Sequence, residues 1–122
     1  MKYVGLIAIA MTLAGCATGL QSRKVEETNP TVYLSVRSAE DYLACLKPAI
    51  DELGDLAELR SYPASGQYDV HIYAEQFDQR HEYFLIRIEA KSDVSATSFF
   101  SLGDDHGKIS ESDLNRELNA CI

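Results

Sequence analysis

Residues 82–91, with the sequence EYFLIRIEAK, decide the fold, because they form the strongest strand pattern in the chain. Apolar side chains occupy every second position of this segment, namely Phe84, Ile86, Ile88 and Ala90. A period of two predicts a β-strand that turns one face toward a core and the other face away from it.

Four further segments around this strand also have strand patterns, and they are residues 31–36, 56–62, 68–75 and 96–102. The connections between the last four strands are short and polar, including the segment Phe77–His81 that precedes the central strand. Short connections favour antiparallel neighbours, because parallel strands need a long crossover.

Two helices are predicted at the ends of this strand array. Ser38 is a suitable N-cap for a helix that runs to Leu53 and stops at Gly54, and Pro48 is expected to kink or divide this helix. Ser110 is the N-cap of a second helix near the C-terminus. The sequence therefore predicts an α+β fold of order β-α-β-β-β-β-α. It has an antiparallel sheet of four to five strands and two helices on one face, in a single domain of residues 31–122.

Length and charge exclude several classes of protein. The chain has 122 residues, 46% hydrophobic and 25% charged, and a net charge of −8. One domain is expected, and neither a disordered chain nor a multi-span membrane protein fits this composition. An acidic chain also lacks the basic face that nucleic acids require, so no nucleic-acid partner is expected.

The N-terminus has the pattern of a secretory signal. Lys2 precedes an apolar run from Val4 to Gly15, which is too short to span a bilayer. The run ends in Leu13-Ala14-Gly15-Cys16, which resembles the lipobox of bacterial lipoproteins at all four positions. This resemblance implies that residues 1–15 are removed and that Cys16 carries the lipid, including palmitate, that holds the protein to a membrane.

The same resemblance places the protein in the periplasm. Ala17 after the lipidated cysteine favours the outer membrane, by similarity with enterobacterial lipoproteins. Residues 16–30 are polar and are expected to be a flexible tether. Loss of Lys2 leaves 10 basic against 19 acidic side chains, a net charge of −9, so the lipid and not a basic patch must provide the attachment.

The remaining cysteines are Cys45 and Cys121. Because the periplasm is oxidising, this even remainder predicts a disulfide, with two buried free thiols as the alternative. Both residues border the core-facing stripes of their predicted helices, which supports the pairing.

No catalytic motif, metal site or cofactor site is predicted, so enzymatic activity stays undecided.

The sheet face opposite the helices is a possible interaction face, because Tyr and Arg are common at binding hot spots. Its predicted members are His71, Tyr73, Tyr83, Leu85, Arg87 and Phe99. The favoured function is a non-enzymatic interaction or accessory module that binds an envelope protein. Ordinary cross-strand pairing is the alternative explanation of the face. The alternative functions are a small-molecule or metal-binding lipoprotein with a pocket near His71, and a hydrolase with an unrecognised site.

Overall fold

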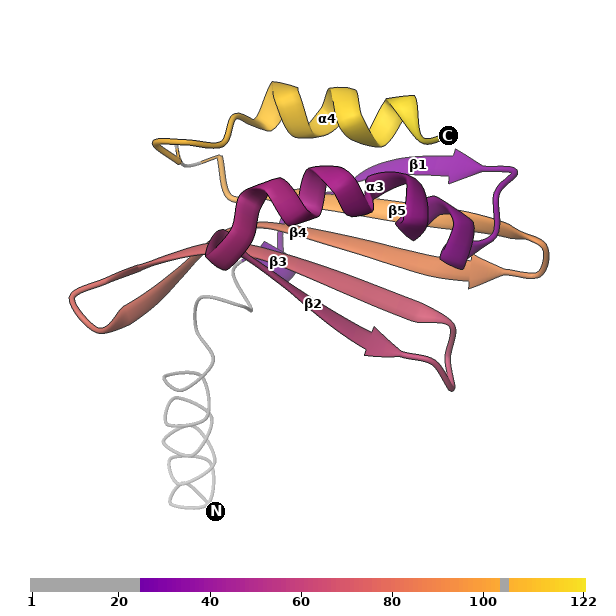
Figure 1. Ribbon diagram of the computed structural model, residues 1–122, viewed down its shortest axis with the longest axis horizontal. Coiled ribbons are helices and arrows are strands. Elements are labelled where there is room, and N and C mark those ends of the chain that lie inside the picture. Colours follow the sequence, from indigo (N-terminus) through magenta and orange to yellow (C-terminus); the bar gives the residue numbers. More distant parts are fainter. Residues whose placement is uncertain (1–24, 104–105) are drawn as a thin grey trace, which may run out of the picture.

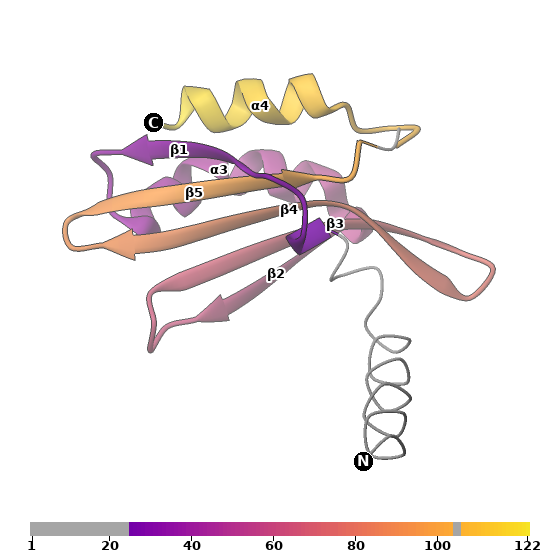
Figure 2. The same cartoon turned by 180° about the vertical axis from the view of Figure 1, so that it is seen from behind.

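The computed structural model describes residues 25–103 and 106–122, and its core is a five-stranded antiparallel sheet with the strand order β1-β5-β4-β3-β2. The elements in chain order are β1 (Thr31–Ser35), α3 (Ala39–Leu53), the 3-10 turn η1 (Gly54–Leu56), β2 (Ala57–Tyr62), β3 (Gln67–Gln76), β4 (Gln79–Lys91), β5 (Val94–Ser101) and α4 (Glu111–Ala120). Figures 1 and 2 show α3 lying across one face of the sheet, with α4 beside it. The predicted fold class and element order are confirmed.

The main core lies between this face and the two helices. The sheet contributes the alternating side chains of β3, β4 and β5, namely Val70, Ile72, Phe84, Ile86, Ile88 and Phe99. Helix α3 contributes Ala39, Tyr42, Leu46 and Ile50, whose spacing of three and four residues puts them on one side of the helix. The period of two in β4 and the helical period in α3 therefore meet in one apolar layer.

Of the two effects expected of Pro48, a kink or a division of the helix, the structure excludes the division. The helix is continuous from Ala39 to Leu53 with Pro48 inside it, and the Ser38 hydroxyl caps its start by accepting from the backbone N–H of Asp41 at 3.2 Å. Proline removes the hydrogen bond to the carbonyl of Ala44, and both Ala44 and Pro48 are exposed. Water can reach the carbonyl at this position, which limits the cost of the missing bond.

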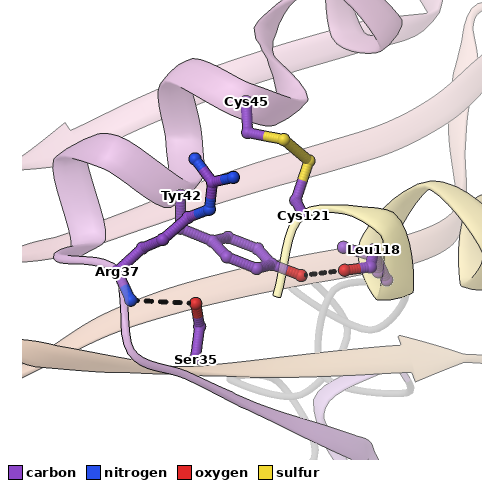
Figure 3. The surroundings of a disulfide bond; sticks show 6 residues. All are labelled: Ser35, Arg37, Tyr42, Cys45, Leu118 and Cys121. Carbon is purple, nitrogen blue, oxygen red and sulfur yellow. Dashed lines mark hydrogen bonds between the residues drawn. A yellow bond between two sulfur atoms is a disulfide. The ribbon is translucent and has the colours of Figure 1, made fainter.

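A disulfide joins the two helices. The Sγ atoms of Cys45 and Cys121 are 2.05 Å apart, so the predicted pairing is the one that the structure has. Next to it, the buried Tyr42 hydroxyl donates to the backbone carbonyl of Leu118 at 2.6 Å (Figure 3). Burial raises the pKa of Tyr42 to about 12, so this hydroxyl keeps its proton and remains a donor.

The segment Phe77–His81, expected to be a polar connection, belongs mostly to a long hairpin. Strands β3 and β4 pair as far as Gln76 and Gln79, and Phe77 and Asp78 form the turn between them. The φ angles of Phe77 and Asp78 are 53° and 61°, which is the backbone of a two-residue hairpin turn. The sequence lacks the glycine that usually marks such a turn, so it predicts strands that end short of the observed hairpin.

The chain before β1 packs on the sheet face opposite the helices, called the outer face below. Val25 is fully buried and clusters with Leu85 and Phe100. The Thr28 side chain donates to the carbonyl of Val25 at 2.7 Å. The folded region thus includes at least part of residues 25–30, which the sequence assigned to a flexible tether. The predicted signal segment and Cys16 lie outside the described residues.

Candidate interaction surfaces

The outer face of the sheet is not the exposed aromatic surface that the sequence predicts. His71 is 5% exposed and pairs with Glu82, and Leu85 is 1% exposed under Val25. Strand alternation places both residues on the outer face correctly. It carries no information about a polar segment that folds back over Leu85.

Phe99 and Tyr83 lie on the helix side of the sheet, so their predicted place on the outer face is wrong. Phe99 pairs with Ile86 in the register of β5 and β4, and its ring stacks on Phe84 in the main core at 5.6 Å. The register of β3 and β4 shifts between Ile72 and Tyr73, which leaves Tyr83 as an extra residue. Tyr83 therefore packs against the main core.

Arg87 lies on the outer face, where it holds a buried carboxylate. Its Nε is 3.0 Å from Oδ1 of Asp69 and its Nη2 is 3.1 Å from Oδ2, a two-pronged contact. The same Nη2 is 3.3 Å from Oε1 of Glu26. Hydrogen bonding to Asp69 raises the pKa of Arg87. Arg87 therefore stabilises the fold, because it connects β4 to Asp69 on β3 and to Glu26 in the segment before β1.

Tyr73 is half-buried under a second arginine. The guanidinium carbon of Arg80 lies 3.8 Å from the centre of the Tyr73 ring, and Arg80 Nη1 is 2.8 Å from Oε2 of Glu58. Arg60 also donates to Glu58, at 2.7 Å. Hydrogen bonds from Arg60, which has the larger effect, and from Arg80 lower the pKa of Glu58 to about 2. The carboxylate therefore stays charged and joins β2 to β4 through Arg80.

His71 forms a buried pair with Glu82 inside the protein. Its Nδ1 is 3.1 Å from Oε2 of Glu82, and both side chains are buried. Arg80 Nε lies 3.1 Å from the other oxygen of Glu82. Within the residues that the structure describes, no group of three or more His, Cys, Asp or Glu side chains is placed to hold a metal ion.

An exposed apolar surface lies instead along β1, at one edge of the sheet. Val32, Leu34 and Val36 are 55%, 71% and 85% exposed. Leu34 and Val36 line a shallow hollow of about 290 Å³ together with Val94, Ile122 and the charged Lys91. We call the five apolar residues, Val32 included, the β1 strip. The alternation in residues 31–36 predicts a strand, but it carries no information on whether that strand lies at an edge of the sheet.

A second hollow lies on the helix side. It is a groove of about 250 Å³ between α3 and α4, with Ile50, Ile72, Ile109 and Leu114 among its apolar lining residues. Lys108 and Glu117 stand among its charged ones. The groove can take a small apolar group, and neither helix pattern alone predicts it.

The described residues include no helix that is both long and apolar enough to cross a membrane. Comparisons of the chain with protein families, curated proteins and solved structures found no significant match.

Proposed function

We propose that this protein is a lipid-anchored accessory protein of the cell envelope, and that its domain binds another envelope protein through the β1 strip. The lipobox pattern that ends at Cys16 supports the anchor and an outer-membrane location facing the periplasm. The disulfide between Cys45 and Cys121 is in keeping with an oxidising compartment.

The exposure of the β1 strip is the observation that carries the binding proposal. Residues 31–36, TVYLSV, contain no charged side chain, although charges commonly protect edge strands from pairing with other chains. At the opposite edge of the sheet, β2 carries Glu58 and Arg60. An apolar edge without such protection is typical of a surface that a partner covers.

The contacts of the outer face also favour β1 over the residues first considered. Arg87 is bound to Asp69, His71 to Glu82, and Arg80 to Glu58. Side chains committed to such contacts cannot bind a partner without first breaking them. The β1 strip can be covered at no such cost.

Photo-crosslinking in the living cell tests the binding site. A photoreactive amino acid at Leu34 should give a discrete adduct, whereas the same group at Lys47, exposed on α3, should give none. Adding Val32→Lys should abolish the Leu34 adduct, because a charge next to the contact opposes burial. Equal adducts from both positions, or none from Leu34, would contradict the proposal.

Metabolic labelling tests the anchor separately. Labelled palmitate should enter the wild-type protein and not the Cys16→Ser variant. Labelling that persists in this variant would refute the lipid assignment and leave the β1 strip to be judged by crosslinking alone.

The groove between α3 and α4 supports a second candidate, binding of a small apolar molecule. Its apolar lining excludes water from a bound hydrocarbon group, which favours binding. A polarity-sensitive naphthalene dye should brighten with the wild-type protein. Brightening should be lost in Ile50→Glu, whose charge would enter the groove, and retained in Leu34→Glu on the β1 strip. Unchanged brightening in Ile50→Glu would reject this candidate.

A further inference from the structure

The hairpin of β3 and β4 reaches beyond the rest of the sheet. Strand β2 ends its pairing with β3 at Ile72, and β5 ends its pairing with β4 at Phe84. Residues 73–82 therefore continue as a two-stranded arm, which projects from one end of the molecule in both views (Figures 1 and 2). Arg80 braces the base of the arm through its contacts with Tyr73, Glu58 and Glu82.

The tip of the arm presents a bare aromatic ring. Phe77 is 97% exposed, the most exposed of the large hydrophobic residues that the structure describes. Its φ of 53° belongs to the left-handed region, where Gly and Asn are favoured and a bulky side chain is unfavourable. A phenylalanine here costs stability and gains no contact within the domain, which points to a contact outside it.

The position of Val25 on the sheet allows the distance from this tip to the predicted anchor at Cys16 to be bounded. Val25 packs on Leu85, and Leu85 on β4 is the register partner of His71 on β3. Val25 therefore lies at the level of His71 along β3. The tip is six residues farther along β3 than His71, or about 20 Å at the rise of a strand. Eight residues separate Cys16 from Val25, and this length of chain can span at most about 30 Å. One bilayer surface can therefore meet both the lipid on Cys16 and the tip.

We propose that Phe77 inserts its ring into the interfacial region of the bilayer to which Cys16 is anchored. This inference rests on the lipid anchor of the proposed function. The lipid holds the arm close to the surface, so a single ring suffices for a second contact that the isolated domain could not sustain. Asp78 beside the ring and the exposed Glu75 favour zwitterionic over anionic headgroups. Two points of contact would hold the domain in one orientation.

The variant Phe77→Trp tests this directly, because the sequence contains no other tryptophan. Full-length lipidated protein is reconstituted into phosphatidylcholine vesicles, and flotation with the vesicles reports the anchor. Tryptophan emission should shift to shorter wavelength and be quenched by brominated lipid. The matched control is Tyr62→Trp, an exposed position at the opposite end of β2 and β3, whose emission should match that of the detergent-solubilised protein.

Each outcome decides between the two claims. Flotation with a shift and quenching at position 77 only supports the inference. Flotation without a shift refutes the contact and leaves the anchor intact. Failure to float refutes both. A shift without lipid quenching means that the ring meets another protein copy, and this result also overturns the membrane contact.

Discussion

Removal of the disulfide should cost this domain a large part of its stability. Cys45 and Cys121 are 76 residues apart, so the bridge closes a long loop in the unfolded chain. In the chain-entropy relation, a loop of this length corresponds to about 15 cal/mol/K, or about 4.5 kcal/mol at 25 °C. Small domains have free energies of unfolding of about 5–15 kcal/mol, so the loss would be at least about a third of the total.

Urea denaturation followed by circular dichroism measures this effect. The double variant Cys45→Ala/Cys121→Ala is compared with its parent, both in a Cys16→Ser background that avoids detergent. With a urea m-value of about 1.5 kcal/mol/M, the midpoint should fall by about 3 M. The reduced parent should unfold at a similar midpoint, which separates loss of the bridge from loss of the sulfur atoms. If the free energy of unfolding decreases by less than about 1 kcal/mol in both the double variant and the reduced parent, the loop-entropy reasoning is refuted.

Three further predictions concern contacts within the fold. Tyr42→Phe removes one of two donors to the Leu118 carbonyl, which keeps the backbone N–H of Cys121 at 3.3 Å, and it should lower the free energy of unfolding by about 1 kcal/mol in urea titrations, whereas an unchanged midpoint would show that the Tyr42 hydrogen bond adds nothing to stability. Arg87→Leu leaves the buried Asp69 carboxylate without its partner and should destabilise the domain by about 3 kcal/mol, an effect that Asp69→Asn in the same chain should partly relieve. Because Glu58 has a folded pKa of about 2, below the ordinary value of 4.5, its stabilisation is present above pH 4.5 and is lost as the pH falls toward 2. Denaturation midpoints across this range should fall less steeply in Glu58→Gln, and parallel curves would contradict the assignment.

The ion pair between Arg87 and Asp69 limits how the outer face can be tested by mutation. From sequence alone, replacing Tyr73 and Arg87 by alanine should weaken a partner without unfolding the domain. The structure shows that Arg87 neutralises a buried carboxylate, so its loss disturbs the fold itself. A weakened interaction in that variant would therefore not identify a binding face. Substitutions on the β1 strip, such as Val32→Lys, do not have this defect, because the side chain is already half in water.

The strand array could be predicted because period-two alternation is a local property. The pattern in residues 82–91 defines β4, and the cysteine positions on the two helices led to the disulfide. The wrong predictions, the sheet faces of Phe99 and Tyr83, depended on the register between neighbouring strands. Phe99 and Phe100 are neighbours, so alternation puts one of them on each face, and only the pairing of Phe99 with Ile86 decides which one enters the main core. The bulge that turns Tyr83 to the helix side has no marker residue in the sequence.

The burial of the outer face depends on a different kind of information. Residues 25–30 are mostly polar, and no period marks them as part of a folded layer. Two contacts nevertheless bind this segment to the sheet, the burial of Val25 against Leu85 and Phe100 and the reach of Glu26 to Arg87. The segment that leads from the predicted anchor is thus also the cover of the outer face. Lifting this segment from the sheet would expose Leu85 and Phe100 together. The β1 strip and the Phe77 tip need no such opening, and this is the structural reason to look for partners there first.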